Sequence, residues 1–204
     1  MQKLKIKKSD WYAVPNILGY IRIILIPLFV WKYLSARTNL DYYLAAGIVI
    51  LSSLTDMFDG KIARKFNQIT ELGKLIDPVA DKLTLCAILI CFSIKFDNLF
   101  KVLLLLFLVK EITMGLLTIL LFQKHGKKLD GAKWFGKFAT AVTDVIVVLL
   151  LLFPHSMQND IYSKYLIYAM IFIVATVMLF AFIMYTKVLL KMLFEAIGNN
   201  KKNR

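Results

Sequence analysis

Residues 56–81 read DMFDGKIARKFNQITELGKLIDPVAD, and this stretch decides the fold class. Four carboxylates, Asp56, Asp59, Asp77 and Asp81, stand in it at helical spacings, between two long apolar runs. Charged side chains near a bilayer cost free energy, so that acids retained there usually mark a functional site. Two divalent cations would balance the four negative charges, as they do in sites that handle phosphoryl groups. The stretch therefore predicts a membrane enzyme with a dinuclear metal site.

Apolar runs on both sides of this stretch are long enough to cross a membrane. The chain has 204 residues, 59% of them hydrophobic, and a positive mean hydropathy. A transmembrane helix needs roughly 20 mostly apolar residues. Six segments approach that length, namely 16–35, 41–60, 76–95, 99–122, 136–153 and 161–187. We predict an all-α polytopic membrane protein with six transmembrane helices in one domain, 14–190, followed by a basic cytoplasmic tail, 191–204.

The net charge of +13 is concentrated in alternate connections. Lysines and arginines cluster before the first span, after the second, between the fourth and fifth, and after the sixth. The other connections carry only isolated cations such as Arg37, Lys95 and Lys164. This positive-inside pattern predicts a multi-pass protein of the cell membrane, with both termini and the acidic stretch on the cytoplasmic side. A basic inner face attracts anionic lipids and substrates, and we expect no nucleic-acid partner.

Two local features leave alternatives open. In residues 1–13, lysines alternate with apolar residues, and Trp11 and Tyr12 stand near the end of the segment. This is typical of an interfacial amphipathic segment, but a signal that only sets topology would look the same. Pro78 follows Asp77 directly, and a proline suits the first turn of a helix but kinks a helix interior.

The acidic stretch forms two stripes of acidic and small residues on successive helices. The first stripe has spacings i, i+3, i+4 and i+7, and the second i, i+4 and i+8. The members are Asp56, Asp59, Gly60 and Ala63, and then Gly73, Asp77 and Asp81. Carboxylates are the hard oxygen ligands that Mg²⁺ and Mn²⁺ prefer. The small residues leave room for a bulky group beside the backbone, and Arg64 is placed to meet a phosphate.

The pattern D-x2-D-G-x2-A-R-x8-G-x3-D-x3-D resembles the signature of the CDP-alcohol phosphotransferases, and the chain matches it at every fixed position. The resemblance implies that an alcohol attacks the β-phosphorus of a CDP-alcohol and releases CMP. It implies two divalent cations, Mg²⁺ or Mn²⁺, on the four aspartates, with Asp81 also acting as general base. It implies a cytidine-nucleotide pocket lined by Gly60, Ala63, Arg64 and Gly73. A homodimer is expected from the same resemblance.

Residues outside the signature resemble bacterial phosphatidylglycerophosphate synthases. They are residues 77–83 (DPVADKL), Pro15 to Leu18 with Arg22, Lys110-Glu111 and Gly136-Lys137. This resemblance implies CDP-diacylglycerol as the donor, the bilayer as its source, and glycerol 3-phosphate as the first acceptor. It implies Asn16 at the nucleotide. The expected ligands of the acceptor phosphate are Arg22, Lys82, Lys110 and Lys137.

Two departures keep the acceptor open. Thr118 and Ala139 stand where those synthases usually carry cations. Two expected phosphate ligands are therefore missing, and phosphatidylglycerol, which would give cardiolipin, is the alternative acceptor. A divalent-ion transporter or channel is the alternative from a different class. Transporters often show a repeated half, which this sequence lacks, and Gly60 and Gly73 suit a nucleotide pocket better than an ion site.

Overall fold

The computed structural model describes residues 8–65, 70, 72–125, 134–153 and 160–202. A short 3-10 helix, η1 (Lys8–Tyr12), precedes six long helices. These are α1 (Val14–Leu34), α2 (Asn39–Lys65), α3 (Gly73–Lys95), α4 (Asn98–His125), α5 (Trp134–Leu152) and α6 (Ile161–Lys202). No strand occurs in the described residues. The all-α prediction is confirmed, and each predicted segment coincides with one helix.

Five of these helices, α1, α2, α4, α5 and α6, are long and apolar enough to cross a membrane, judged by length and composition over the described ranges. α3 does not meet this criterion, because Asp77, Asp81 and Lys82 interrupt its apolar residues. The apolar helices indicate a membrane-embedded protein.

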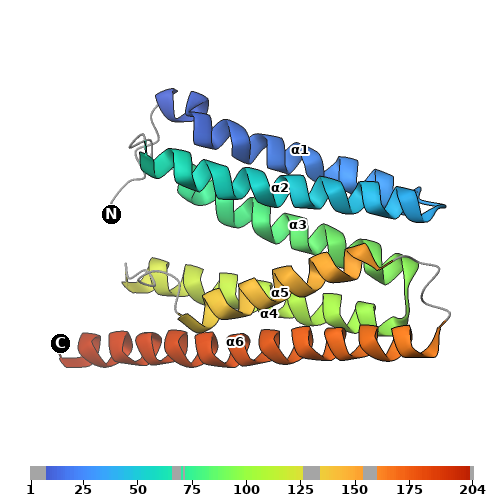
Figure 1. Cartoon of the computed structure of the whole chain (residues 1–204). Helices are drawn as coiled ribbons and strands as arrows, with labels where there is room; N and C mark the ends of the chain where they lie inside the picture. The colour runs from blue at the N-terminus through green and yellow to red at the C-terminus, as the bar shows by residue number, and fades with distance from the viewer. Residues whose placement is uncertain (1–7, 66–69, 71, 126–133, 154–159, 203–204) are drawn as a thin grey trace.

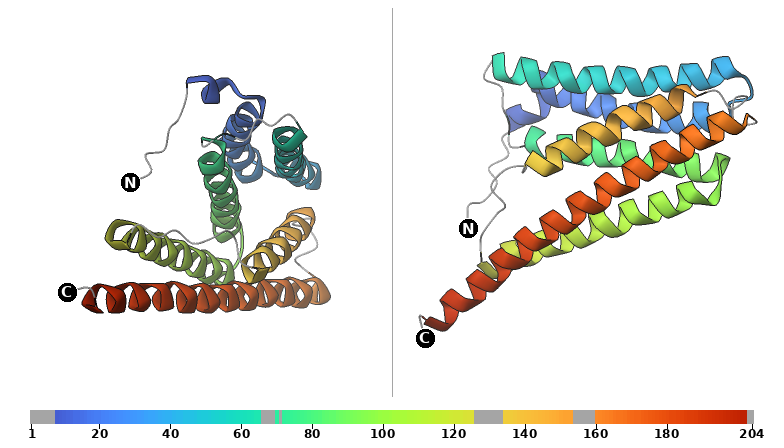
Figure 2. Two further views of the ribbon diagram at one scale, coloured as in Figure 1. Left: turned by 90° about the vertical axis from the view of Figure 1, so that its left-hand side faces the viewer. Right: turned by 60° about the horizontal axis from the view of Figure 1, so that its bottom comes forward.

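The six long helices form two groups of three (Figure 1). In the first group, α1 packs against α2 and α3, and in the second, α6 packs against α4 and α5. Contacts of α3 with α4 and of α2 with α5 join the groups. Viewed end-on, α3 lies between the α1–α2 pair and the other three helices (Figure 2). The ends of α2, α4 and α6 share one end of the bundle with the starts of α1, α3 and α5 (Figure 1).

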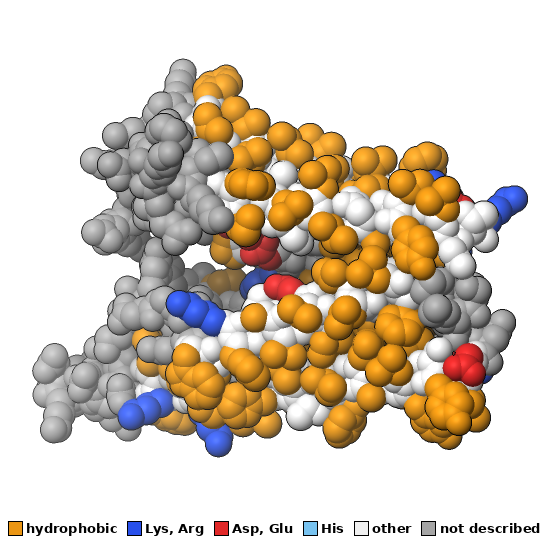
Figure 3. All heavy atoms as spheres, in the orientation of Figure 1, with side chains coloured by type: hydrophobic (Ala, Val, Ile, Leu, Met, Phe, Trp, Pro, Cys, Tyr) orange, Lys and Arg blue, Asp and Glu red, His pale blue; other side chains and the backbone are white. Residues whose placement is uncertain are grey.

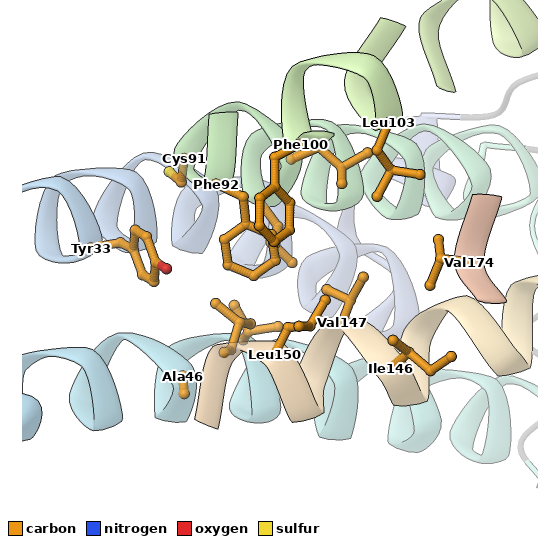
Figure 4. Close-up of a cluster of buried hydrophobic side chains, with 14 of the residues drawn as sticks. Tyr33, Ala46, Cys91, Phe92, Phe100, Leu103, Ile146, Val147, Leu150 and Val174 are labelled. Carbon is orange, nitrogen blue, oxygen red and sulfur yellow. The ribbon is translucent and has the colours of Figure 1, made fainter. Parts of the chain in front are cut away.

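An apolar core fixes the helices where the two groups meet (Figure 4). Aromatic rings from three helices contact one another in it. The ring centroids of Tyr33 and Phe92 are 5.8 Å apart, and those of Phe92 and Phe100 are 5.1 Å apart. Val147 of α5 and Val174 of α6 are buried in the same cluster. Tilted and edge-on ring contacts add about 0.5–1.5 kcal/mol each to the burial of apolar surface.

The helix ends show where Pro78 lies and how far the last helix extends. α3 begins at Gly73, so Pro78 lies inside the helix and not in its first turn. α6 has 42 residues, which at 1.5 Å per residue is about 63 Å, roughly twice the hydrocarbon thickness of a bilayer. Much of the predicted tail, through Lys202, therefore continues this helix. Of the predicted interfacial segment, residues 1–7 lie outside the described part, and Lys8–Tyr12 forms η1.

Candidate active site

Arg22 of α1 joins three of the four signature acids. Its Nη1 lies 2.6 Å from Oδ1 of Asp56 and 2.8 Å from Oδ1 of Asp81. Its Nη2 lies 3.9 Å from Oδ1 of Asp77. Hydrogen bonds between charged groups are about twice as strong as neutral ones. One guanidinium therefore holds together carboxylates from α2 and α3, the two helices whose stripes were predicted to face each other. The role of Arg22 at the acceptor phosphate stays a prediction.

The two sides of this cluster differ in exposure. The side chain of Arg22 is 2% exposed, whereas those of Asp56, Asp77 and Asp81 are 46%, 46% and 56% exposed. Figure 3 shows acidic and basic side chains gathered in a hollow between the two groups of helices, on a largely apolar face. The arginine is thus part of the interior, while the carboxylates remain open to a ligand.

Gly19, one turn before Arg22, allows α1 and α3 to approach closely. A Cβ atom at Gly19 would lie 2.8 Å from Cγ2 of Ile76 and 3.9 Å from Oδ1 of Asp77. Any side chain at this position would have to displace the side chain of Ile76 on α3. The glycine therefore sets the separation at which Arg22 reaches the acids of α3.

Asn16 and Gly73, both predicted at the nucleotide, are neighbours at the start of α3. Asn16 is 1% exposed, and its amide donates to the backbone carbonyl of Asp10 and to the Thr70 hydroxyl, at 2.5 and 2.9 Å. The same hydroxyl accepts from the backbone N–H of Gly73 at 2.9 Å. A Cβ at Gly73 would lie 2.6 Å from Oδ1 of Asn16. Asn16 thus connects α1 to the start of α3, and its role toward a nucleotide stays a prediction.

The remaining residues of the first stripe lie on α2, whose helix continues to Lys65. Asp59, Gly60 and Ala63 therefore have the helical spacing that was predicted, and Arg64 follows them on the same helix. Their side chains lie outside the described part of the structure, and their roles at the metal and the nucleotide stay predictions.

Two predicted acceptor cations meet on a single acid. Nζ of Lys82 lies 2.6 Å from Oε2 of Glu111, and Nζ of Lys110 lies 2.8 Å from Oε1 of the same residue. This pairing brings lysines of α3 and α4 together and leaves one net positive charge, next in sequence to Asp81. Lys137, the fourth predicted cation, is exposed near the start of α5.

One acid that was not among the predicted site residues, Asp144, lies in the middle of α5. Burial is the largest influence on its carboxylate, and the charges of Asp81 and Asp56 also reach it, so α5 brings an acid near the cluster. The high cost of a charge within an apolar span would have identified it.

The chemistry of the donor set fits a divalent cation. Asp56 and Asp81 contact one nitrogen of Arg22, and Asp77 lies 3.9 Å from the other. Their carboxylate oxygens are the ligand type that suits Mg²⁺ and Mn²⁺. Among the described residues, no three His, Cys, Asp or Glu side chains are close enough to share an ion. The side chain of Asp59, the fourth predicted ligand, lies outside the described part of the structure.

The whole helical domain matches a known family. Residues 12–193 match the family model of the CDP-alcohol phosphatidyltransferases. The chain belongs to this family. Members of the CDP-alcohol phosphatidyltransferase family generally use divalent metal ions, which agrees with the acid cluster. Membership in this family disfavours the ion transporter or channel.

Three relatives carry names of two kinds. A "Cardiolipin synthase (CMP-forming)" of Streptomyces coelicolor is 31% identical over 143 residues, which are 69% of this chain and 65% of that protein. A "CDP-diacylglycerol--glycerol-3-phosphate 3-phosphatidyltransferase" of Rickettsia felis is 40% identical over 98 residues, 48% of this chain and 53% of that protein. A protein of the same name from Shigella flexneri is 28% identical over 175 residues, 85% of this chain and 93% of that protein. The chain thus spans between half and two thirds of the length of the first two.

Proposed function

We propose that this protein transfers a phosphatidyl group from CDP-diacylglycerol to an alcohol and releases CMP. The observation that carries the proposal is the meeting of Asp56, Asp77 and Asp81 around Arg22, within the stretch that matches the family. The carboxylates are open on the side away from the arginine, where a pyrophosphate and an alcohol would have to bind.

In the proposed reaction, the acceptor oxygen attacks the β-phosphorus of CDP-diacylglycerol. The bond from this phosphorus to the oxygen of CMP breaks, and CMP leaves. Asp81 takes the proton of the attacking hydroxyl, and Arg22 holds Asp81 at 2.8 Å in a fixed position. Holding the hydroxyl in line with the leaving group lowers the barrier further. Asp56, Asp59, Asp77 and Asp81 would hold two divalent cations, which neutralise charge on the pyrophosphate.

Glycerol 3-phosphate is the acceptor that we place first. Its phosphate requires cations near Asp81, and Lys82 and Lys110 are gathered there on Glu111. The names of the Rickettsia and Shigella relatives support this choice. Lys137 would complete the set from α5.

Phosphatidylglycerol is the second candidate, because two cations expected for glycerol 3-phosphate are replaced. The hydroxyl of Thr118 donates to the carbonyl of Met114 in its own helix, and Ala139 is buried. Neither side chain offers a charge to a phosphate monoester. The name of the Streptomyces relative supports this acceptor.

We further propose that α3 is a sixth membrane span and that the cluster faces the cytoplasm in the cell membrane. α3 has 23 residues and lies alongside α1. The basic connections that flank the cluster support this orientation. A homodimer is proposed on the family resemblance alone.

The experiment that tests the function is CMP release by the detergent-purified protein. CDP-diacylglycerol and Mg²⁺ would be supplied with either glycerol 3-phosphate or phosphatidylglycerol in separate reactions, with a chelator as control. Metal-dependent release with glycerol 3-phosphate would support the first acceptor, and release only with phosphatidylglycerol would support the second. No release with either acceptor would contradict the proposal as stated.

A further inference from the structure

Polar residues form a single stripe along the first half of α5. Lys137, Thr140 and Asp144 stand at i, i+3 and i+7, and all three are exposed. From Val145 to the end of the helix at Leu152 every residue is apolar. At 1.5 Å per residue the stripe runs about 10 Å, from near the helix start to its middle. A stripe of this kind on a lipid-facing surface would be costly, so it is expected to line a water-filled cleft.

The packing of α5 places Asp144, the inner end of this stripe, near the acid cluster. α5 packs against α2, the helix that carries Asp56. The neighbouring residues Thr143 and Val147 are each 3% exposed, and so form the packed face beside the stripe. The charges that act on the Asp144 carboxylate are those of Asp81 and Asp56. Acidic side chains therefore line the hollow between the two groups of helices (Figure 3).

Asp144 is exposed by surface area, although surrounding atoms partly desolvate its carboxylate, and it has no countercharge among the described residues. The acids of the signature are held by Arg22, whereas the described part of the chain supplies no ion pair or hydrogen bond to the Asp144 side chain. Such a carboxylate needs hydrogen-bond donors when substrate fills the cleft and displaces water. A hydroxyl group is such a donor, and its hydrogen bonds to a carboxylate are short and strong.

A glycerol-type acceptor brings two hydroxyls to the cleft, of which only one attacks. We propose that Asp144 is a positioning residue that accepts a hydrogen bond from the second hydroxyl of the acceptor, while Asp81 receives the attacking hydroxyl. This inference rests on the proposed function. The recognised chemistry is the vicinal diol of glycerol, which both glycerol 3-phosphate and phosphatidylglycerol carry.

The test compares acceptors with and without the second hydroxyl. The pairs are glycerol 3-phosphate with 3-hydroxypropyl phosphate, and phosphatidylglycerol with phosphatidyl-1,3-propanediol. The ratio of kcat/KM within each pair would be measured for the wild type, Asp144→Ala and Asp144→Asn. Val145→Ala is the matched control, because Val145 is the next residue and is 61% exposed.

The wild type should prefer the active diol acceptor by about ten- to a hundredfold, the range for a hydrogen bond to a charged group. Asp144→Ala should reduce this preference to about threefold or less. Asp144→Asn, which keeps an acceptor oxygen without the charge, should give an intermediate preference, and Val145→Ala the full one. The acceptor pair in which Asp144→Ala loses the preference shows whether the diol belongs to a free phosphate ester or to a lipid.

A preference that survives in Asp144→Ala and Asp144→Asn would overturn the inference. An equal loss of kcat/KM with both members of a pair, reversed by added Mg²⁺, would also overturn it. Asp144 would then act on the cations. A wild type that turns over both members equally fast would also overturn it, while leaving the proposed function intact. Absence of CMP release by the wild type with every acceptor would instead remove the proposed function, and the inference with it.

Discussion

Asp81 is the residue on which the proposed chemistry depends most. Asp81→Asn keeps the size of the side chain but removes its ability to accept a proton. We expect kcat to fall by about a hundredfold or more, with CDP-diacylglycerol binding largely retained. CMP release and direct lipid-binding measurements would separate the two effects. Asp97→Asn, which changes an exposed acid bonded to Tyr168, should leave both unchanged. Equal loss of binding and turnover in Asp81→Asn would contradict its role as base.

Lys110 tests the acceptor pocket. Lys110→Ala removes one of the two lysines on Glu111, so the KM for glycerol 3-phosphate should rise several-fold, while the KM for CDP-diacylglycerol stays the same. Steady-state kinetics with each substrate varied in turn would measure this. Lys101→Ala, which loses only a bond to Asn98 in the same helix, is the control. An unchanged KM for glycerol 3-phosphate would exclude Lys110 from the pocket.

Arg22 tests how the cluster is held when metal is absent. Arg22→Met leaves Asp56 and Asp81 without their partner, so the metal-free protein should lose about 1–3 kcal/mol of stability. The loss should lie toward the lower end because both acids are partly exposed. Thermal unfolding in detergent with a chelator would show a lower midpoint, and Mg²⁺ should restore part of it. The unfolding midpoint of Arg22→Lys should lie between those of the wild type and Arg22→Met. An unchanged midpoint in Arg22→Met would contradict the proposal that Arg22 holds the acids together.

The sequence predicted which residues share a helix face, but not which helices meet. The spacings from Asp56 to Asp81 gave the two acidic stripes correctly, because helical periodicity is a local property. The approach of Arg22 to both stripes depends on the packing of α1, which no local pattern contains. Asp144 lies outside the signature, so the motif did not predict it, although its position within an apolar run carries the same physical signal as that of Arg22.

At the scale of helices, the contact between α1 and α3 depends on Gly19. Gly19→Ala should lower both the unfolding midpoint and the rate of CMP release, because the new Cβ would meet Ile76 at 2.8 Å. Gly47→Ala is the matched control on α2, where nothing lies within 4 Å of a Cβ. It should be neutral or stabilise the protein, since alanine favours a helix by about 1 kcal/mol over glycine. Equal effects of the two substitutions would show that close approach at Gly19 is unimportant.

Helix ends were the least predictable feature of the elements. Hydropathy ended the last segment at residue 187, but α6 continues through Lys202, because charged residues such as lysine and glutamate also favour helices outside the membrane. Pro78 was ambiguous for the opposite reason, since proline is compatible with a helix start and tolerated within a membrane helix.

At the scale of the whole molecule, the charge pattern makes a prediction about topology. Thr38→Cys and Asp160→Cys, in the connections after α1 and α5, should react with a membrane-impermeant maleimide from outside intact cells. Trp134→Cys, at the opposite end of the bundle, should react only in inverted vesicles. The wild type is the control, because Cys86 is half-buried and Cys91 is buried. Labelling of Trp134→Cys from outside would reverse the proposed orientation.

The ends of the bundle also differ in how much surface they offer. The connections at the end away from the acid cluster are only residues 35–38, 96–97 and 153–160. In the proposed orientation these connections would face outward, and together they hold fewer residues than the roughly 20–30 that an antibody or protein partner covers. In that orientation these connections would give immune recognition little to bind, and a drug aimed at the acid cluster would have to dissolve in the bilayer or reach the cytoplasm.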